Sequence, residues 1–139
     1  MTSPTVLRLP VFSRVPLWLA LRAWFALVTV DVVLKLGGFP RLYRKVRNCP
    51  VADRKPVDEA VSLICTAVDR ACTWYLKHAL CLQRSAVATF LLRRAGVPAE
   101  LVIAARRMPF QGHAWVEVDG HVVNDQSAVQ ETYLVLDRL

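Results

Sequence analysis

Residues 81–125 read CLQRSAVATFLLRRAGVPAELVIAARRMPFQGHAWVEVDGHVVND and carry the strongest fold signal in the chain. The first third of this stretch has the periodicity of a helix that begins near Cys81, and Gly96 and Pro98 are typical of its end. The run LVIAA at 101–105 is apolar throughout, as in a buried strand. A helix that opens on a cysteine therefore leads directly into a sheet.

Two segments of alternating character, 113–118 and 121–125, flank Asp119-Gly120, a pair that is typical of tight hairpin turns. The last part of the chain is expected to add a strand at 132–136. Helices that precede an antiparallel sheet make an α+β arrangement. We therefore expect an α+β fold with helices packed on a small antiparallel sheet.

Cys81, His113 and Asp125 stand in the order thiol, imidazole and carboxylate, which are the parts of a cysteine nucleophile system. The backbone N–H groups at a helix start stabilise a thiolate, and they can also form one side of an oxyanion hole. Each residue alone is weak evidence, because a free cysteine is usually an inert core residue and a lone histidine is often structural. Together they are the catalytic residues that we predict.

The register of the hairpin decides whether the imidazole can meet the carboxylate. A two-residue loop would pair Asp125 with Ala114 and turn His113 away from the carboxylate. A three-residue loop at 118–120, with its glycine in the left-handed conformation, would place His113 directly opposite Asp125. We predict the three-residue loop.

Other titratable side chains compete for these roles. Asp119 is needed by its own turn, and Glu117 lies on the face of the predicted base but two positions along the strand. His121 is expected in solvent near the turn. His78 is a minor rival base.

The chain of 139 residues is long enough for one domain with a proper core, and its 55% hydrophobic content argues against disorder. Its four cysteines include no CxxC pair, which indicates reduced thiols and a cytoplasmic location more than a disulfide or zinc framework. Cys65 and Cys72 are seven positions apart on one side of a predicted helix, so we expect both in the core.

Neither a metal nor a cofactor is expected. The three histidines are scattered singly, and a zinc site at Cys81, His113 and Asp125 would still need a fourth ligand or a water. The sequence contains no glycine-rich phosphate loop, no Gly-x-Ser-x-Gly and no dinucleotide-binding fingerprint.

The positive charge of the chain, +7 in total, is concentrated in residues 1–55, which hold ten of the eighteen Lys and Arg residues and two acidic residues. Such a surface suits an acidic partner protein, a membrane surface or nucleic acid. Nucleic acid ranks lowest, because no recognised nucleic-acid motif or interleaved aromatic pattern accompanies the charge.

The segment 16–36, PLWLALRAWFALVTVDVVLKL, is strongly apolar and compatible with a helix. Arg22 and Asp31 interrupt it, so its longest uninterrupted apolar run is about eight residues, where a membrane span needs roughly 20. No small-residue cleavage site follows, as a signal peptide requires. The favoured interpretation is a helix buried against the domain or a partner, ahead of membrane-surface association and of a true span.

Gly37-Gly38 are expected to end this helix, and 39–55 to form a basic connector. We accordingly divide the chain into a basic, apolar and helical N-terminal extension, residues 1–55, and a core, residues 56–139. A second helix is expected to start at Pro56 and to bury one apolar face. Its first turn would hold two acidic residues and its face six apolar ones: Asp58, Glu59, Val57, Val61, Ile64, Val68, Ala71 and Tyr75. In the helix that follows, three arginines are expected to point outward: Arg84, Arg93 and Arg94.

The combined motifs resemble the lasso-peptide biosynthesis B2 proteins over about residues 57–127. The shared pattern is a Cys-Leu-x-Arg-Ser opening, a helix that ends in Arg-x-Gly-x-x-Ala, a strand, His-Ala-Trp-Val-Glu and Val-x-Asp. The resemblance implies a transglutaminase-like core of papain-like topology and a cysteine peptidase that removes the leader from a ribosomally made precursor peptide. By motif, Cys81 is the nucleophile, His113 the base and Asp125 the orienting acid.

The resemblance also implies partners. The chain looks like the stand-alone form, which works with a separate leader-recognition B1 protein and precedes an ATP-dependent macrolactam cyclase, and the basic N-terminal part is then a candidate docking surface. A non-catalytic peptide-binding module of the same fold and an amide-transferring enzyme stay open as alternatives. For the oxyanion hole, the backbone N–H of Cys81 is the first candidate, with Gln83 and Trp74 as side-chain candidates.

Overall fold

A computed structural model describes residues 14–57, 59–75 and 80–139, and the structural statements below concern these residues. The elements in chain order are α2 (Leu17–Arg47), α3 (Ala60–Thr73), α4 (Cys81–Arg94), β1 (Ala99–Arg106), β2 (Gln111–Val118), β3 (His121–Val122), α5 (Val129–Thr132) and β4 (Leu134–Arg138).

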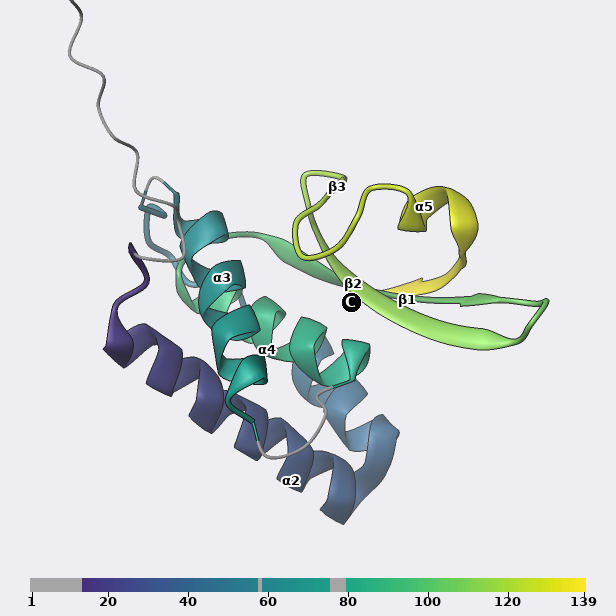
Figure 1. Ribbon diagram of the computed structural model, residues 1–139, viewed down its shortest axis with the longest axis horizontal. Coiled ribbons are helices and arrows are strands. Elements are labelled where there is room, and N and C mark those ends of the chain that lie inside the picture. The colour runs from purple at the N-terminus through teal and green to yellow at the C-terminus, as the bar shows by residue number, and fades with distance from the viewer. Residues whose placement is uncertain (1–13, 58, 76–79) are drawn as a thin grey trace, which may run out of the picture.

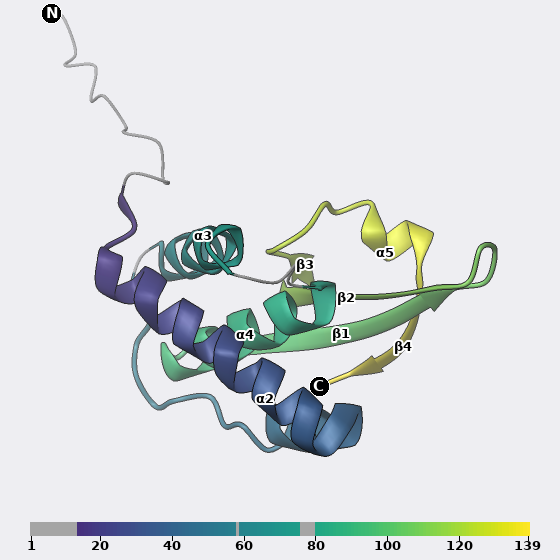
Figure 2. The same cartoon turned by 60° about the horizontal axis from the view of Figure 1, so that its bottom comes forward.

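The four strands form one antiparallel sheet in the order β3-β2-β1-β4, so the α+β prediction is confirmed. Figure 1 shows α2, α3 and α4 gathered on one side of the sheet and α5 on the other. In Figure 2, α4 lies between α2 and the sheet. The helix that begins at Cys81 is therefore the central one.

Alternation along β2 divides its side chains between two apolar clusters. Ala114 and Val116 belong to the larger cluster, with the buried residues of α2, α3 and α4. Trp115 belongs to a smaller cluster on the opposite face, where it packs with Val129 and Tyr133. Because the larger cluster joins α2 to the sheet, the N-terminal helix is packed onto the strands through α4.

The first long helix does not end at the glycine pair. Gly38 has φ 65° and ψ −171°, which breaks the helical path, but a helix resumes with Pro40 near its start and continues to Arg47. Leu42 and Val46 are buried, so this second part is stabilised by packing. The prediction of a connector is therefore wrong for 39–47.

Within the described part of the chain, α2 is the one helix long and apolar enough to cross a membrane by length and composition. Only 22% of its most apolar stretch of 18 residues is buried. A helix that is apolar on its exposed side as well as on its buried side has an unpartnered face.

The helix expected from Pro56 begins four residues later, at Ala60, after Glu59 in the left-handed conformation. Ile64, Val68 and Ala71 are buried as predicted, whereas Val57 is 75% exposed. Asp58 lies outside the described residues.

Arg93 contradicts its predicted outward position, because it is 7% exposed at the end of α4. Its guanidinium donates to four backbone carbonyls, on Val46, Cys49, Ala99 and Leu139. These four carbonyls satisfy the donors of a buried cation. They also connect the end of α2 and the segment after it with β1 and with the residue that follows β4.

Candidate active site

Cys81 is the first residue of α4, where the sequence places it. Gln83 caps this start: its Oε1 accepts the backbone N–H of Leu80 at 2.8 Å, and its Nε2 donates to Oδ1 of Asp31 at 3.3 Å. The position of the thiol-bearing turn is thus tied to α2. A thiol at this place lies at the positive end of the helix dipole.

His113 and Asp125 form a hydrogen-bonded pair, with 2.7 Å between Nε2 and Oδ2. The other carboxylate oxygen, Oδ1, accepts the backbone N–H of Gln126 at 2.7 Å, which holds the carboxylate in place. Their side chains are 20% and 26% exposed, so the pair stands at the surface but is largely shielded. With Nε2 on the carboxylate, Nδ1 is the ring nitrogen left for a thiol.

This pair forms in a register that we did not predict. Val118 pairs with His121, and Asp119 and Gly120 have φ 51° and 77°, as in a two-residue type I′ turn. The predicted three-residue loop is therefore wrong. The contact survives because β3 ends at Val122: the N–H of Val123 still donates to the carbonyl of Val116, and the chain turns away from the strand pairing after it, so that Asp125 reaches His113.

Asn124 explains how the chain turns. Its Oδ1 accepts the backbone N–H of Val116 at 2.7 Å and so replaces a strand carbonyl, while its Nδ2 donates to the hydroxyl of Ser85 at 2.9 Å. Arg84 donates to the carbonyl of Asn124 at 2.6 Å, and Ser85 donates to the carbonyl of Ala114 at 3.1 Å. The segment that carries the carboxylate is thereby fastened both to β2 and to the second turn of α4.

The structure places the thiol-bearing helix and the His–Asp pair in one connected unit. It shows no hydrogen bond between the Cys81 thiol and the His113 ring within the ranges that it describes. His113 lies on the face of β2 opposite to Ala114 and stacks on Tyr133, whereas the body of α4 packs on the Ala114 face. The roles of Cys81, His113 and Asp125 remain predictions.

Aromatic side chains support the imidazole. Tyr133 stacks on His113 with 4.9 Å between ring centroids and an interplanar angle of 29°. The guanidinium of Arg106 lies over the ring of Tyr133, 5.7 Å from its centroid. The ring centroids of Trp115 and His113 are 5.9 Å apart. Sequence reasoning missed Tyr133 and Asn124, because their places depend on how the segment after β3 folds back and no local spacing signals it.

Glu117 is not the partner of the imidazole. It is 1% exposed and accepts hydrogen bonds from Trp115, Gln130 and Arg138. Burial by itself raises the pKa of Glu117, but these hydrogen bonds outweigh burial and hold the pKa below its ordinary value. Its hydrogen bonds thus connect β2 with α5 and β4.

The remaining candidates have other surroundings. Burial raises the pKa of the Cys65 thiol to about 11 and also raises the pKa of Cys72, so neither thiol is suited to act as a nucleophile. His121 is exposed and its Nδ1 lies 2.9 Å from the carbonyl of Asp119. His78 lies outside the described residues.

Both side-chain candidates for the oxyanion hole make other contacts. Both ends of the Gln83 amide have partners. Trp74 is half exposed beneath the guanidinium of Arg70, 4.6 Å from the ring centroid. Among the residues with described positions, no three His, Cys, Asp or Glu side chains are grouped as metal ligands would be.

Comparison with known proteins agrees with this architecture. A family model described as the transglutaminase-like superfamily matches residues 26–138. The chain is also similar to the microcin J25-processing protein McjB of Escherichia coli, with 38% identity over 56 residues. That match covers 40% of this chain and 27% of McjB, so the chain corresponds to only about a quarter of that relative. No solved structure matches.

Proposed function

The chain belongs to the transglutaminase-like superfamily, and from this premise we propose that it is a cysteine peptidase that removes the leader from a lasso precursor peptide. The observation that carries the proposal is the 2.7 Å pair of His113 and Asp125, fastened through Asn124 to the helix that begins with Cys81. The similarity to a microcin-processing protein supports a role in peptide processing.

In the proposed reaction, the Cys81 thiolate attacks the scissile carbonyl carbon, and the backbone N–H groups at the start of α4 stabilise the oxyanion. His113, protonated after taking the thiol proton, gives that proton to the leaving amine as the C–N bond breaks. A thioester to Cys81 remains, and water activated by His113 hydrolyses it. Asp125 holds the ring through Nε2 and stabilises the imidazolium.

The proposed partners follow the same chemistry. The substrate is the leader region of a precursor peptide, which a separate recognition protein presents, and the released core peptide passes to an ATP-dependent macrolactam cyclase. These steps require ATP and reduced thiols, so we place the protein in the cytoplasm.

The test is incubation of the full chain with a lasso precursor peptide and its recognition protein, followed by mass analysis of the products. We expect separated leader and core peptides, and a rate at least about a thousandfold lower for Cys81→Ala. Cys49→Ala is the matched control and should cleave normally, since Cys49 lies in the segment after α2 and far along the chain from the site.

The other outcomes distinguish the alternatives. Precursor binding without cleavage by the unaltered chain would identify a binding module and contradict the peptidase. Addition of an amine, in place of water, to the carboxyl end of the leader would identify an amide-transferring enzyme. Undiminished cleavage by Cys81→Ala would remove Cys81 from the reaction.

A further inference from the structure

Two hollows lie along α2, away from Cys81, His113 and Asp125. One has a volume of about 580 Å³ and is bounded by α2, α3, the segment 52–57 and the end of α4. The other, of about 470 Å³, lies between the two parts of α2 and the end of α4. Both are lined by Arg22, Leu91 and Arg94, so they meet, and we call them together the α2 groove.

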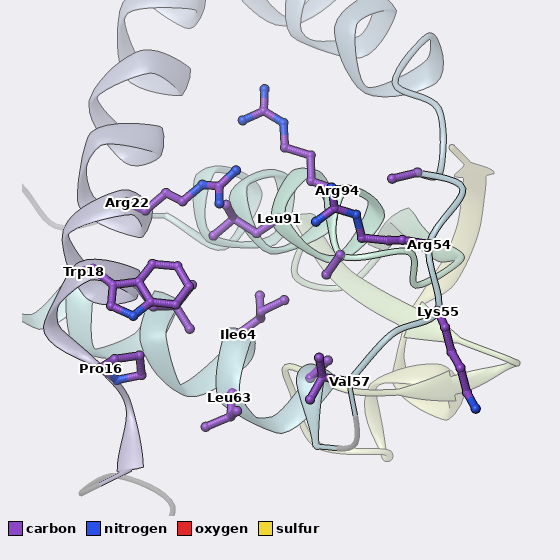
Figure 3. A pocket seen from close by; sticks show the side chains of 14 residues that line it. Pro16, Trp18, Arg22, Arg54, Lys55, Val57, Leu63, Ile64, Leu91 and Arg94 are labelled. Atoms are coloured by element: carbon purple, nitrogen blue, oxygen red, sulfur yellow. The ribbon is translucent and has the colours of Figure 1, made fainter.

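The charged residues that line the α2 groove are all basic: Arg22, Lys45, Arg54, Lys55 and Arg94. Figure 3 shows Arg22, Arg54 and Arg94 around one end of the larger hollow, while Lys55 extends away from it. None of the five takes part in an ion pair with any residue whose position the structure describes. The groove therefore presents uncompensated positive charge to a ligand.

The backbone segments that carry Arg54 and Arg94 are fastened to each other. Ala52 donates its N–H to the carbonyl of Arg93 at 2.8 Å, which fastens the segment 52–57 to the end of α4. Gly96, with φ 86°, packs so closely on this segment that a Cβ there would lie 2.1 Å from the carbonyl oxygen of Arg54. The walls that carry Arg54 and Arg94 are thus one fixed unit.

The remaining lining is apolar and partly exposed. Trp18 and Phe25, about two turns apart on α2, are 62% and 63% exposed, and Ile64 and Leu91 form the floor. Large exposed aromatic side chains beside a buried apolar floor are typical of an interaction surface.

The shape of the site selects the class of partner. In the part of α2 before Gly38, the lining residues run from Trp18 to Val33, which at 1.5 Å per residue is roughly 23 Å, the length of about seven extended residues. A groove of this length accepts single side chains in its two hollows.

We propose that the α2 groove binds an extended, acidic segment of a partner peptide whose apolar side chains fill the two hollows. Carboxylates of the segment lie against Arg22, Arg54 and Arg94, where bidentate pairing with guanidinium groups is available. None of the three catalytic candidates lines the groove, so peptide binding does not depend on the proposed peptidase chemistry. Peptide binding in the α2 groove and the proposed peptidase activity can therefore be refuted independently.

The experiment is selection of a random 12-residue phage-displayed peptide library on the immobilised full chain, followed by fluorescence anisotropy with the selected peptides at 150 mM salt. We expect selected sequences in which Asp or Glu alternates with apolar residues. Their affinity should fall at least tenfold with the double substitution Arg22→Glu and Arg94→Glu.

The matched control is Arg41→Glu with Arg44→Glu. These residues are exposed on the second part of α2 and make the same change in net charge, but they do not line the groove. The control should change affinity less than twofold. Trp18→Ser should weaken binding severalfold, whereas Trp74→Ser, 50% exposed and outside the groove, should not. Circular dichroism of each variant establishes that it is folded.

Three results would overturn the proposal. Equal loss of affinity in both double variants would indicate unspecific charge attraction. Selected peptides that lack acidic residues would contradict the stated chemistry. Failure to select any peptide, together with groove-dependent binding to vesicles of phosphatidylglycerol and phosphatidylcholine, would assign the surface to lipid.

Discussion

Replacement of Asn124 by alanine tests how the carboxylate of the site is held. The Asn124 side chain, 9% exposed, is bonded to the backbone N–H of Val116 and to the hydroxyl of Ser85. Alanine removes both partners at once and leaves the segment that carries Asp125 with fewer ties to β2 and α4. We expect lower stability and a loosened His–Asp pair.

The magnitude follows from the two hydrogen bonds. A buried N–H left without an acceptor costs about 1–3 kcal/mol, and loss of the bond to Ser85 adds about 1 kcal/mol. Asn124→Ala should therefore lower the free energy of unfolding by about 2–4 kcal/mol, a large share of the roughly 5–15 kcal/mol typical of a domain.

Urea denaturation followed by circular dichroism measures the stability change, and ¹⁵N NMR of the His113 ring reports the pair. The ring N–H signal of the unaltered protein should become exchange-broadened in the variant. Gln126→Ala is the matched control, because Gln126 is exposed two positions along and its backbone N–H is retained. A loss below about 0.5 kcal/mol, or no larger than in the control, would refute the reasoning.

Three further predictions concern other parts of the core. The pKa of Glu117 is held below its ordinary value of 4.5, so its ionised form contributes stability that is present above pH 4.5 and is lost as the pH falls below it. Between pH 7 and pH 3, the melting temperature of the unaltered protein should therefore fall more steeply than that of Glu117→Gln. Arg93→Met should cost about 3 kcal/mol or more in urea denaturation, because the protein loses the hydrogen bonds from one guanidinium to four backbone carbonyls, of which those of Val46 and Leu139 keep a backbone N–H donor. The exposed Arg94→Met should cost little, and similar losses in the two variants would contradict this expectation. At pH 7.5 iodoacetamide should modify Cys81 well before Cys65, whose pKa is raised to about 11 by burial, and peptide mapping that found equal rates would count against it.

Local signals in the sequence identify the elements of the site but not the way in which they meet. A helix start at Cys81 follows from apolar periodicity and from Gly96 at the other end, and the structure has the helix at Cys81–Arg94. The turn at Asp119-Gly120 is also a local signal. The register differed from our prediction because Asp119 and Gly120 both adopt positive φ and close a two-residue turn. Asp125 still reaches His113 because Asn124 supplies a side-chain acceptor in place of a strand carbonyl.

Local sequence also did not predict which residues of the helix ends are buried. Arg93 has the local pattern of an exposed helix end, yet its guanidinium is satisfied by carbonyls from segments distant in sequence. Residues 37–47 likewise include Gly37, Gly38 and Pro40, which disfavour a helix, and the helix that resumes after Gly38 is stabilised by the burial of Leu42 and Val46 against other elements. Periodicity within one segment does not contain such tertiary information.

The most direct test of the central claim is acid quench of the full chain during turnover of a lasso precursor with its recognition protein, followed by peptide mapping. We predict that the carboxyl end of the leader is attached to Cys81 as a thioester. This acyl-enzyme should accumulate in a variant in which hydrolysis of the thioester is slowed. Cleavage that proceeds with no acyl group on Cys81, or with the group on Cys49, would contradict the account.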